Sequence, residues 1–175
     1  IAGLETAKDT LDQDSLRCLE WDENELVRYD LLEGNWRIVA VWEGHSGGTT
    51  RGAFDEEEDQ HALAPAAADI MRTDAMEYFI NITHDEYYRH LKEYFGNTVV
   101  AMFTDEPSPR GRMSAPGFRG EQVAWTPGFL PAVQSWWEED VGRWLPALWL
   151  DCGPRTEEFR GVYNKAVQLR LRETF

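Results

Sequence analysis

The stretch that decides the fold is "NTVVAMFTDEPSPRGR", residues 97–112, in which an apolar run ends at two adjacent carboxylates. Residues 99–103 are rich in β-forming side chains and are apolar at every position. That pattern is typical of a strand covered on both faces, as in a parallel sheet. We therefore expect residues 99–103 to form a buried strand that carries Thr104, Asp105 and Glu106 to its carboxyl end.

The proline that follows restricts the geometry of the acidic pair. Pro107 cannot continue a ladder of hydrogen bonds, and it biases Glu106 toward an extended conformation. Successive side chains of an extended segment point in opposite directions, so only one of Asp105 and Glu106 should face a cleft. The alternative is that the carboxylates cap a helix or anchor a loop, and their position alone does not decide between the two readings.

The segments on either side predict an α/β protein. Three strand-like runs with short turns between them indicate an antiparallel β-meander over residues 15–42. A one-sided apolar stripe predicts a helix over residues 75–95, which Gly96 is well placed to end. Further helices are expected from Thr126 to Gly142 and over residues 156–174, so that residues 73–175 read as helix, strand and helices.

Composition narrows the classes of partner and compartment. The formal net charge of −15 and the pI of about 4.6 argue against a nucleic-acid partner, which needs a basic footprint. No run of apolar residues is long enough to suggest a membrane-spanning helix. The first residues lack the pattern of a signal peptide, and two cysteines do not make a disulfide framework. These features predict a reducing compartment such as the cytoplasm.

A long irregular segment separates the meander from the predicted helix. It contains four glycines and the acidic run "DEEED", residues 55–59. Long loops inside compact domains are often functional, so a flexible active-site loop and a plain surface insertion are both open. The acidic run is expected to be solvated, and a cation site built from it is the alternative reading.

One long stretch resembles a known enzyme family. "DIMRTDAMEYFINITHDEYYRHLKEYFGNTVVAMFTDEPSPRGR" is similar to a stretch of large bacterial glycoside hydrolases with a (β/α)8 catalytic domain, in particular the alpha-L-rhamnosidase-like group. The segments "LLEGNWRIVAVW", "WTPGFLPAVQSWWEEDVGRWLPALW" and "RGVYNKAVQLRLRETF" resemble the same group, so the similarity covers about three quarters of the chain. The matching positions in the long stretch are Asp69, Phe79, Ile80, Thr83, His84, Tyr87, Phe95, Gly96 and Phe103 to Pro107.

The resemblance implies that the chain, residues 1–175, is one segment of a TIM (β/α)8 barrel domain that cleaves glycosidic bonds. It implies a general-acid role for Glu106, because a glycosidic oxygen leaves only when an acid protonates it. The second carboxylate would come from a later barrel strand in this family. Since a complete barrel needs about 250 residues, the 175-residue chain is not expected to turn over substrate by itself.

Other residues are candidates for binding the sugar. Asp105 and Asp69 offer carboxylates to hydroxyl groups, with capping as the alternative role for Asp69. Trp42 and Trp125 lie beside irregular loops, where an aromatic face can stack on a sugar ring, although core packing is the more common fate of tryptophan. His45 lies in the glycine-rich loop and could contact a hydroxyl group.

Two further classes of function stay open. A noncatalytic carbohydrate-binding or structural domain would keep the fold but lack a second carboxylate within about 5 to 10 Å of Glu106. A divalent-metal hydrolase would use Asp105, Glu106 and the acidic run, and calcium is the cation that such oxygen ligands would take. No cofactor or resident metal is otherwise expected. An unclosed barrel would leave edges and apolar faces uncovered, so self-association is a further expectation.

Overall fold

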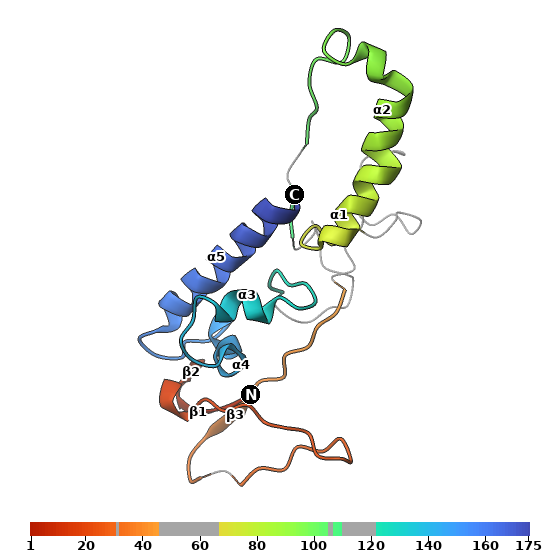
Figure 1. Cartoon of the computed structure of the whole chain (residues 1–175). Helices are drawn as coiled ribbons and strands as arrows, with labels where there is room; N and C mark the ends of the chain where they lie inside the picture. Colours follow the sequence, from red (N-terminus) through yellow and green to blue (C-terminus); the bar gives the residue numbers. More distant parts are fainter. Residues whose placement is uncertain (31, 46–66, 105–106, 110–121) are drawn as a thin grey trace, which may run out of the picture. The chain divides into compact units, whose positions relative to one another are not determined.

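The structure is a computed structural model that describes residues 1–30, 32–45, 67–104, 107–109 and 122–175 (Figure 1). Its contacts divide the chain into two units. Unit 1 contains Ile1–Glu43 and Pro127–Ala166, and unit 2 contains Gly44–Thr126 and Val167–Phe175. Each unit is described separately below. No helix in the described ranges is long and apolar enough to cross a membrane.

Unit 1 contains a small antiparallel sheet of three strands in the order β2-β1-β3. The strands are β1 (Ala2–Ala7), β2 (Thr10–Leu11) and β3 (Trp36–Ile38). The turn between β1 and β2 places Asp9 at a φ of 59°, a conformation that Asp tolerates better than most residues. In the other pair, Gly3 of β1 lies opposite Arg37 of β3.

The predicted meander over residues 15–42 is wrong in its first two strands. Only β3 lies in that range among the described strands, and it pairs with β1, which comes from the first seven residues. Residues 16–30 make a single bridge, between Arg17 and Ala2. The Asp22 side chain accepts hydrogen bonds from the backbone N–H groups of Asn24 and Leu26, at 2.8 and 2.9 Å. Such bonds compete with a ladder and hold these residues in a turn.

The helices of unit 1 surround an aromatic core. They are α3 (Leu130–Gln134), α4 (Val141–Trp144) with a 3-10 turn over Leu145–Leu148, and the first half of α5 (Thr156–Thr174). Trp137, Trp144 and Phe159 are buried, with ring centroids 5.1 to 5.9 Å apart. The Arg155 guanidinium lies 4.1 Å from the centre of the Trp137 ring, and a Glu139 carboxylate oxygen accepts from it at 2.5 Å.

The sequence predicted one of these helices correctly and merged two others. The prediction for residues 156–174 is confirmed by α5. The single helix expected from Thr126 to Gly142 is wrong, because α3 begins at Leu130 and Gly142 lies inside α4. The Gln134 amide donates to the carbonyls of Trp137 and Glu139 and accepts from the N–H of Val141, which stabilises a turn where a longer helix was expected.

Unit 2 contains a long helical segment, drawn in yellow and green in Figure 1. It comprises α1 (Thr73–Phe79), a π-helical turn (Ile80–Asp85), α2 (Glu86–Leu91) and a 3-10 turn (Lys92–Tyr94). The helix expected over residues 75–95 is thus confirmed to within two residues, and Gly96, at a φ of 82°, follows its end as predicted. The expected apolar stripe is mostly exposed, and only Met76 and Met71 just before α1 are buried.

The expected buried strand over residues 99–103 is wrong in this structure. Val99 makes one bridge with Phe95, and Val100–Phe103 form no strand with any described residue. Val100 is 81% exposed and Phe103 is 89% exposed. Figure 1 draws these residues as a coil without a strand arrow, and none of the described residues forms a ladder with them. The barrel itself stays a prediction.

We predict that Phe159→Ala destabilises unit 1 by about 3–5 kcal/mol, because it leaves a cavity between Trp137 and Trp144. Urea unfolding followed by tryptophan fluorescence measures the change. Phe175→Ala is the matched control, since Phe175 is 55% exposed at the end of the described chain. A loss below about 1 kcal/mol for Phe159→Ala would show that the aromatic cluster does not hold the unit together.

The two thiols should differ in reactivity. Burial raises the pKa of the Cys152 thiol from its ordinary 9.0 to about 11, whereas Cys18 is exposed. Because the folded pKa is raised, the stabilisation linked to the protonated Cys152 is complete below about pH 9 and is lost as pH rises toward 11. At pH 8 a thiol reagent should label one cysteine per native chain and two after denaturation. Two labels on the native chain would contradict the burial of Cys152.

Candidate functional site

The candidate general acid lies outside the described residues, as does its neighbour Asp105. The structure describes the residues on both sides of the pair. Thr104 is exposed at the end of the extended segment, and Pro107 is exposed just beyond the pair. A helical segment, the turn at Gly96 and residues 100–104, which form no strand with any described residue, precede the acidic pair along the chain.

Asp69 is the predicted site residue whose contacts are best defined. Its Oδ1 accepts from the backbone N–H of Met71 at 2.9 Å, and its carbonyl accepts from the N–H of Arg72 at 3.1 Å. Its Oδ2 accepts from the hydroxyl of Thr126 at 2.6 Å. All four residues belong to unit 2. Asp69 thus shapes the turn before α1 and ties it to a residue 57 positions away in the sequence.

The Thr126 side chain is a partner that the sequence analysis missed. Thr126 was expected to open a helix, but its hydroxyl donates to Asp69 and its side chain is 2% exposed. The Thr174 hydroxyl donates in addition to the carbonyl of Ile70 at 2.7 Å, within the same unit. The turn at residues 69–71 is therefore held from two sides. The pairing of Asp69 with a Thr-Pro step has no local signature in the sequence.

These contacts favour the anchoring role of Asp69. Both carboxylate oxygens already accept one hydrogen bond from the protein. Each carboxylate oxygen has two lone pairs, so a sugar hydroxyl could still donate to Asp69 on its half-exposed side. Sugar binding by Asp69 therefore stays a prediction, whereas its structural role is directly visible in the contacts.

The remaining predicted binding residues are distributed between the two units. Trp125 is half-buried in unit 2, next to the anchored Thr126. His45 is exposed and also belongs to unit 2. Trp42 belongs to unit 1 and is 68% exposed. Within unit 2, the structure therefore brings Asp69 into contact with Thr126, the neighbour of Trp125.

The π-helical turn is a second feature that sequence reasoning missed. π-helical turns are rare, and they occur frequently at functional sites. The turn brings the rings of Phe79 and His84 into an edge-to-face contact with centroids 5.3 Å apart. The Thr83 hydroxyl donates to the carbonyl of Phe79. The His84 side chain is exposed, and its ring contact with Phe79 lies on the helix surface.

The residues next to this turn form a surface ion-pair group. Glu86 accepts from Arg89 at 2.5 Å, and the Arg89 side chain also contacts His90. The Arg89 guanidinium holds the pKa of the Glu86 carboxyl below its ordinary value. All three side chains are exposed, so solvent and salt screen these ion pairs strongly.

No group of three or more metal-ligating side chains occurs within the described residues. The acidic run at residues 55–59, Asp105 and Glu106 all lie outside them, as does most of the long loop. The predicted alternatives for that loop and for a calcium site therefore stay predictions.

Comparisons of the chain with protein-family profiles, with curated proteins and with solved structures gave no match. The family resemblance therefore rests on the stretches quoted under the sequence analysis.

We predict an energetic coupling between Asp69 and Thr126. In a double-mutant cycle with Asp69→Ala and Thr126→Val, the coupling should be about 1.5–3 kcal/mol, the range for a hydrogen bond to a charged group. Urea unfolding of the two single variants and the double variant measures it. The matched control is the pair Asp69→Ala with Thr98→Val, since Thr98 is exposed in the same unit. Additive effects at Asp69 and Thr126 would remove the anchoring role.

Proposed function

We propose that the chain is part of the catalytic domain of a glycoside hydrolase of the alpha-L-rhamnosidase-like group. Glu106 is the general acid of this domain. The observation that carries the proposal is the element "FTDEP", Phe103 to Pro107, which follows a helix with the Thr-His-Asp-x-Tyr pattern of Thr83 to Tyr87. In this reading the element stands at the ligand-facing end of a barrel strand, where such enzymes place their catalytic side chains.

The local structure around the element supports the proposal. Residues 73–94 are helical, Gly96 turns the chain, and residues 100–104 are extended up to the acidic pair. This order of elements is what an α/β domain needs between a helix and the following strand. Successive side chains of an extended segment point in opposite directions, so in this proposal Asp105 and Glu106 take different directions.

The anchored turn before α1 is a second line of support. The hydrogen bond from Thr126 to Asp69 joins two of the stretches that resemble the family, the one that begins at Asp69 and the one that contains "WTPGF". Sites assembled from loops need their loops held by hydrogen bonds and packing. The bond places the half-buried Trp125 beside a fixed turn, where its ring can serve as a wall of a sugar site.

The chemistry assigned to Glu106 is proton donation. The glycosidic oxygen is a poor leaving group, and a carboxylic acid that protonates it as the bond breaks removes that barrier. A second carboxylate acts on the opposite face of the sugar, as nucleophile or as base toward water. Asp105 is a poor candidate for it because neighbouring side chains of an extended segment point apart. In this proposal Asp105 binds a sugar hydroxyl, and another strand supplies the second carboxylate.

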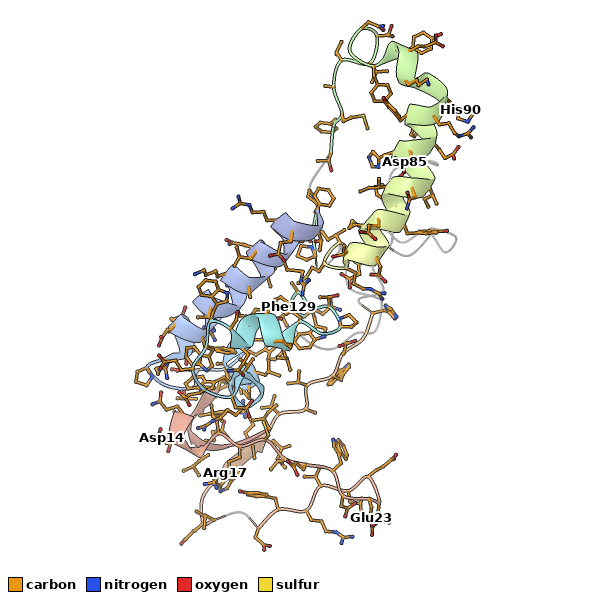
Figure 2. All side chains as sticks on the ribbon, in the orientation of Figure 1. Asp14, Arg17, Glu23, Asp85, His90 and Phe129 are labelled. Atoms are coloured by element: carbon orange, nitrogen blue, oxygen red, sulfur yellow. The ribbon has the colours of Figure 1, made fainter. Side chains whose placement is uncertain are left out.

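The test is Glu106→Gln in the full protein that carries this sequence, assayed on glycosides with leaving groups of graded acidity. The panel includes alpha-L-rhamnosides. We expect a loss of about 10²- to 10⁴-fold on alkyl or methoxyphenyl glycosides, which need protonation. Dinitrophenyl glycosides leave without help from an acid, so the loss on them should be much smaller. The control is Glu23→Gln, an exposed glutamate in unit 1, which should keep full activity (Figure 2).

Two outcomes would contradict the assignment. An equal loss on every leaving group would show that Glu106 is not the acid. Full activity of the variant on a substrate that the parent cleaves would remove Glu106 from catalysis altogether.

A further inference from the structure

Strand β3 has one edge that no described residue occupies. On the β1 side, the Glu5 N–H donates to the carbonyl of Asn35 at 2.7 Å, and Ile1 and Val39 exchange two hydrogen bonds of 2.8 and 2.9 Å. Trp36, Ile38 and Ala40 alternate along the segment with the residues that pair with β1. They therefore direct their backbone N–H and C=O groups to the opposite side. Among the described residues, none hydrogen-bonds to these groups.

The side chains along this edge are apolar and carry no free charge. Ile38 is 65% exposed, and Val41 and Trp42 farther along the segment are also exposed. Arg37 is the charged residue of β3, and its guanidinium donates to Glu5 and to Asp9 at 2.6 Å each. An apolar and unpaired edge is a template for another strand.

A segment of unit 2 offers the complementary feature. Val99–Phe103 is extended beyond its first residue, contains no charged side chain and exposes Val100, Met102 and Phe103. None of the described residues hydrogen-bonds to the backbone of residues 100–103. Its side chains have high β propensity, but residues 100–103 have no neighbouring strand among the described residues. The outer edge of β3 likewise has no neighbouring strand among them.

We propose that copies of this chain associate by strand addition, in which residues 99–103 of one copy pair with the open edge of β3 in another copy. This pairing and the barrel strand of the proposed function exclude each other within any one chain, so strand addition applies to chains whose residues 99–103 are unpaired. The added strand supplies partners for Trp36, Ile38 and Ala40 and covers apolar side chains of both segments. The contact joins two different surfaces, so it is heterologous, and two such contacts close a dimer while single ones make open chains.

Charge favours this contact over other contacts between two copies. Each chain has a formal net charge of −15, which opposes association in general. Neither β3, with Arg37 neutralised, nor residues 99–103 add to that repulsion. The remaining long-range repulsion is screened within about 8 Å at physiological salt. Association should therefore strengthen as salt concentration rises.

Two proline variants test the two surfaces separately. Ile38→Pro removes the outward N–H of β3 and keeps the β1 pairing of residues 37 and 39. The double variant Ala101→Pro, Met102→Pro removes two successive backbone N–H donors. Successive N–H groups of a strand point to opposite edges, so one of the two lost donors would have faced the β3 edge. Light scattering coupled to size-exclusion chromatography over a range of concentrations should show each variant with an apparent dissociation constant raised at least about tenfold. Ile38→Thr keeps the N–H and is the control, which should still associate.

Mixing the two proline variants is the decisive measurement. The Ile38→Pro chain keeps its segment 99–103, and the Ala101→Pro, Met102→Pro chain keeps its β3 edge. A mixture should therefore form a one-to-one heterodimer, which differently sized tags would reveal. Near-ultraviolet circular dichroism of the buried tryptophans checks that both variants stay folded.

Three results would overturn the proposal. One is a monomer at every concentration and salt level. The second is association that neither proline variant weakens. The third is loss of association in both variants without recovery in the mixture, which would show that residues 99–103 and β3 do not pair with each other.

Discussion

An extended segment is stable only where a neighbouring strand takes up its backbone N–H and C=O groups. In this chain that constraint separates the segments that become strands from those that only resemble them. β1 is the one strand with neighbours on both sides, because β3 pairs along one edge and β2, with Ser15 and Arg17, takes up the other. Residues 16–30 and 99–103 have strand-like sequences, and neither has a ladder among the described residues.

The same constraint explains why the two units differ in how they bury apolar side chains. In unit 1, short helices enclose Trp137, Trp144 and Phe159, and Glu139 neutralises Arg155 where it covers the Trp137 ring. A cation over an aromatic face that also has an anionic partner stabilises without leaving a buried charge unpaired. In unit 2, the long helical segment has a one-sided apolar pattern but few apolar neighbours, so most of its aromatic residues are exposed.

Long periodic segments and local turn signals were the most predictable features. α5 agrees with its prediction because its apolar stripe faces an enclosed core, and Gly96 follows its helix because glycine adopts a positive φ without strain. Strand pairing was not predictable in the same way. The sequence around Asp22 favours a turn only through side-chain bonds that compete with a ladder, and hydrophobic runs alone do not reveal that competition. The tie between Asp69 and Thr126 joins distant residues, so no local pattern could have indicated it.

The properties that leave residues 99–103 exposed are also the properties that a catalytic strand needs. A strand that delivers an acid to a sugar has to be apolar on both faces, because layers on both sides must hold it rigidly. Such a segment cannot pair its own backbone N–H and C=O groups, and these groups stay unpaired until the segment joins the edge of a sheet. The strand addition proposed between copies and the barrel strand proposed for Glu106 thus share one physical basis. They differ in which sheet supplies the ladder, and in both cases Pro107 prevents the pairing from continuing past the carboxylates.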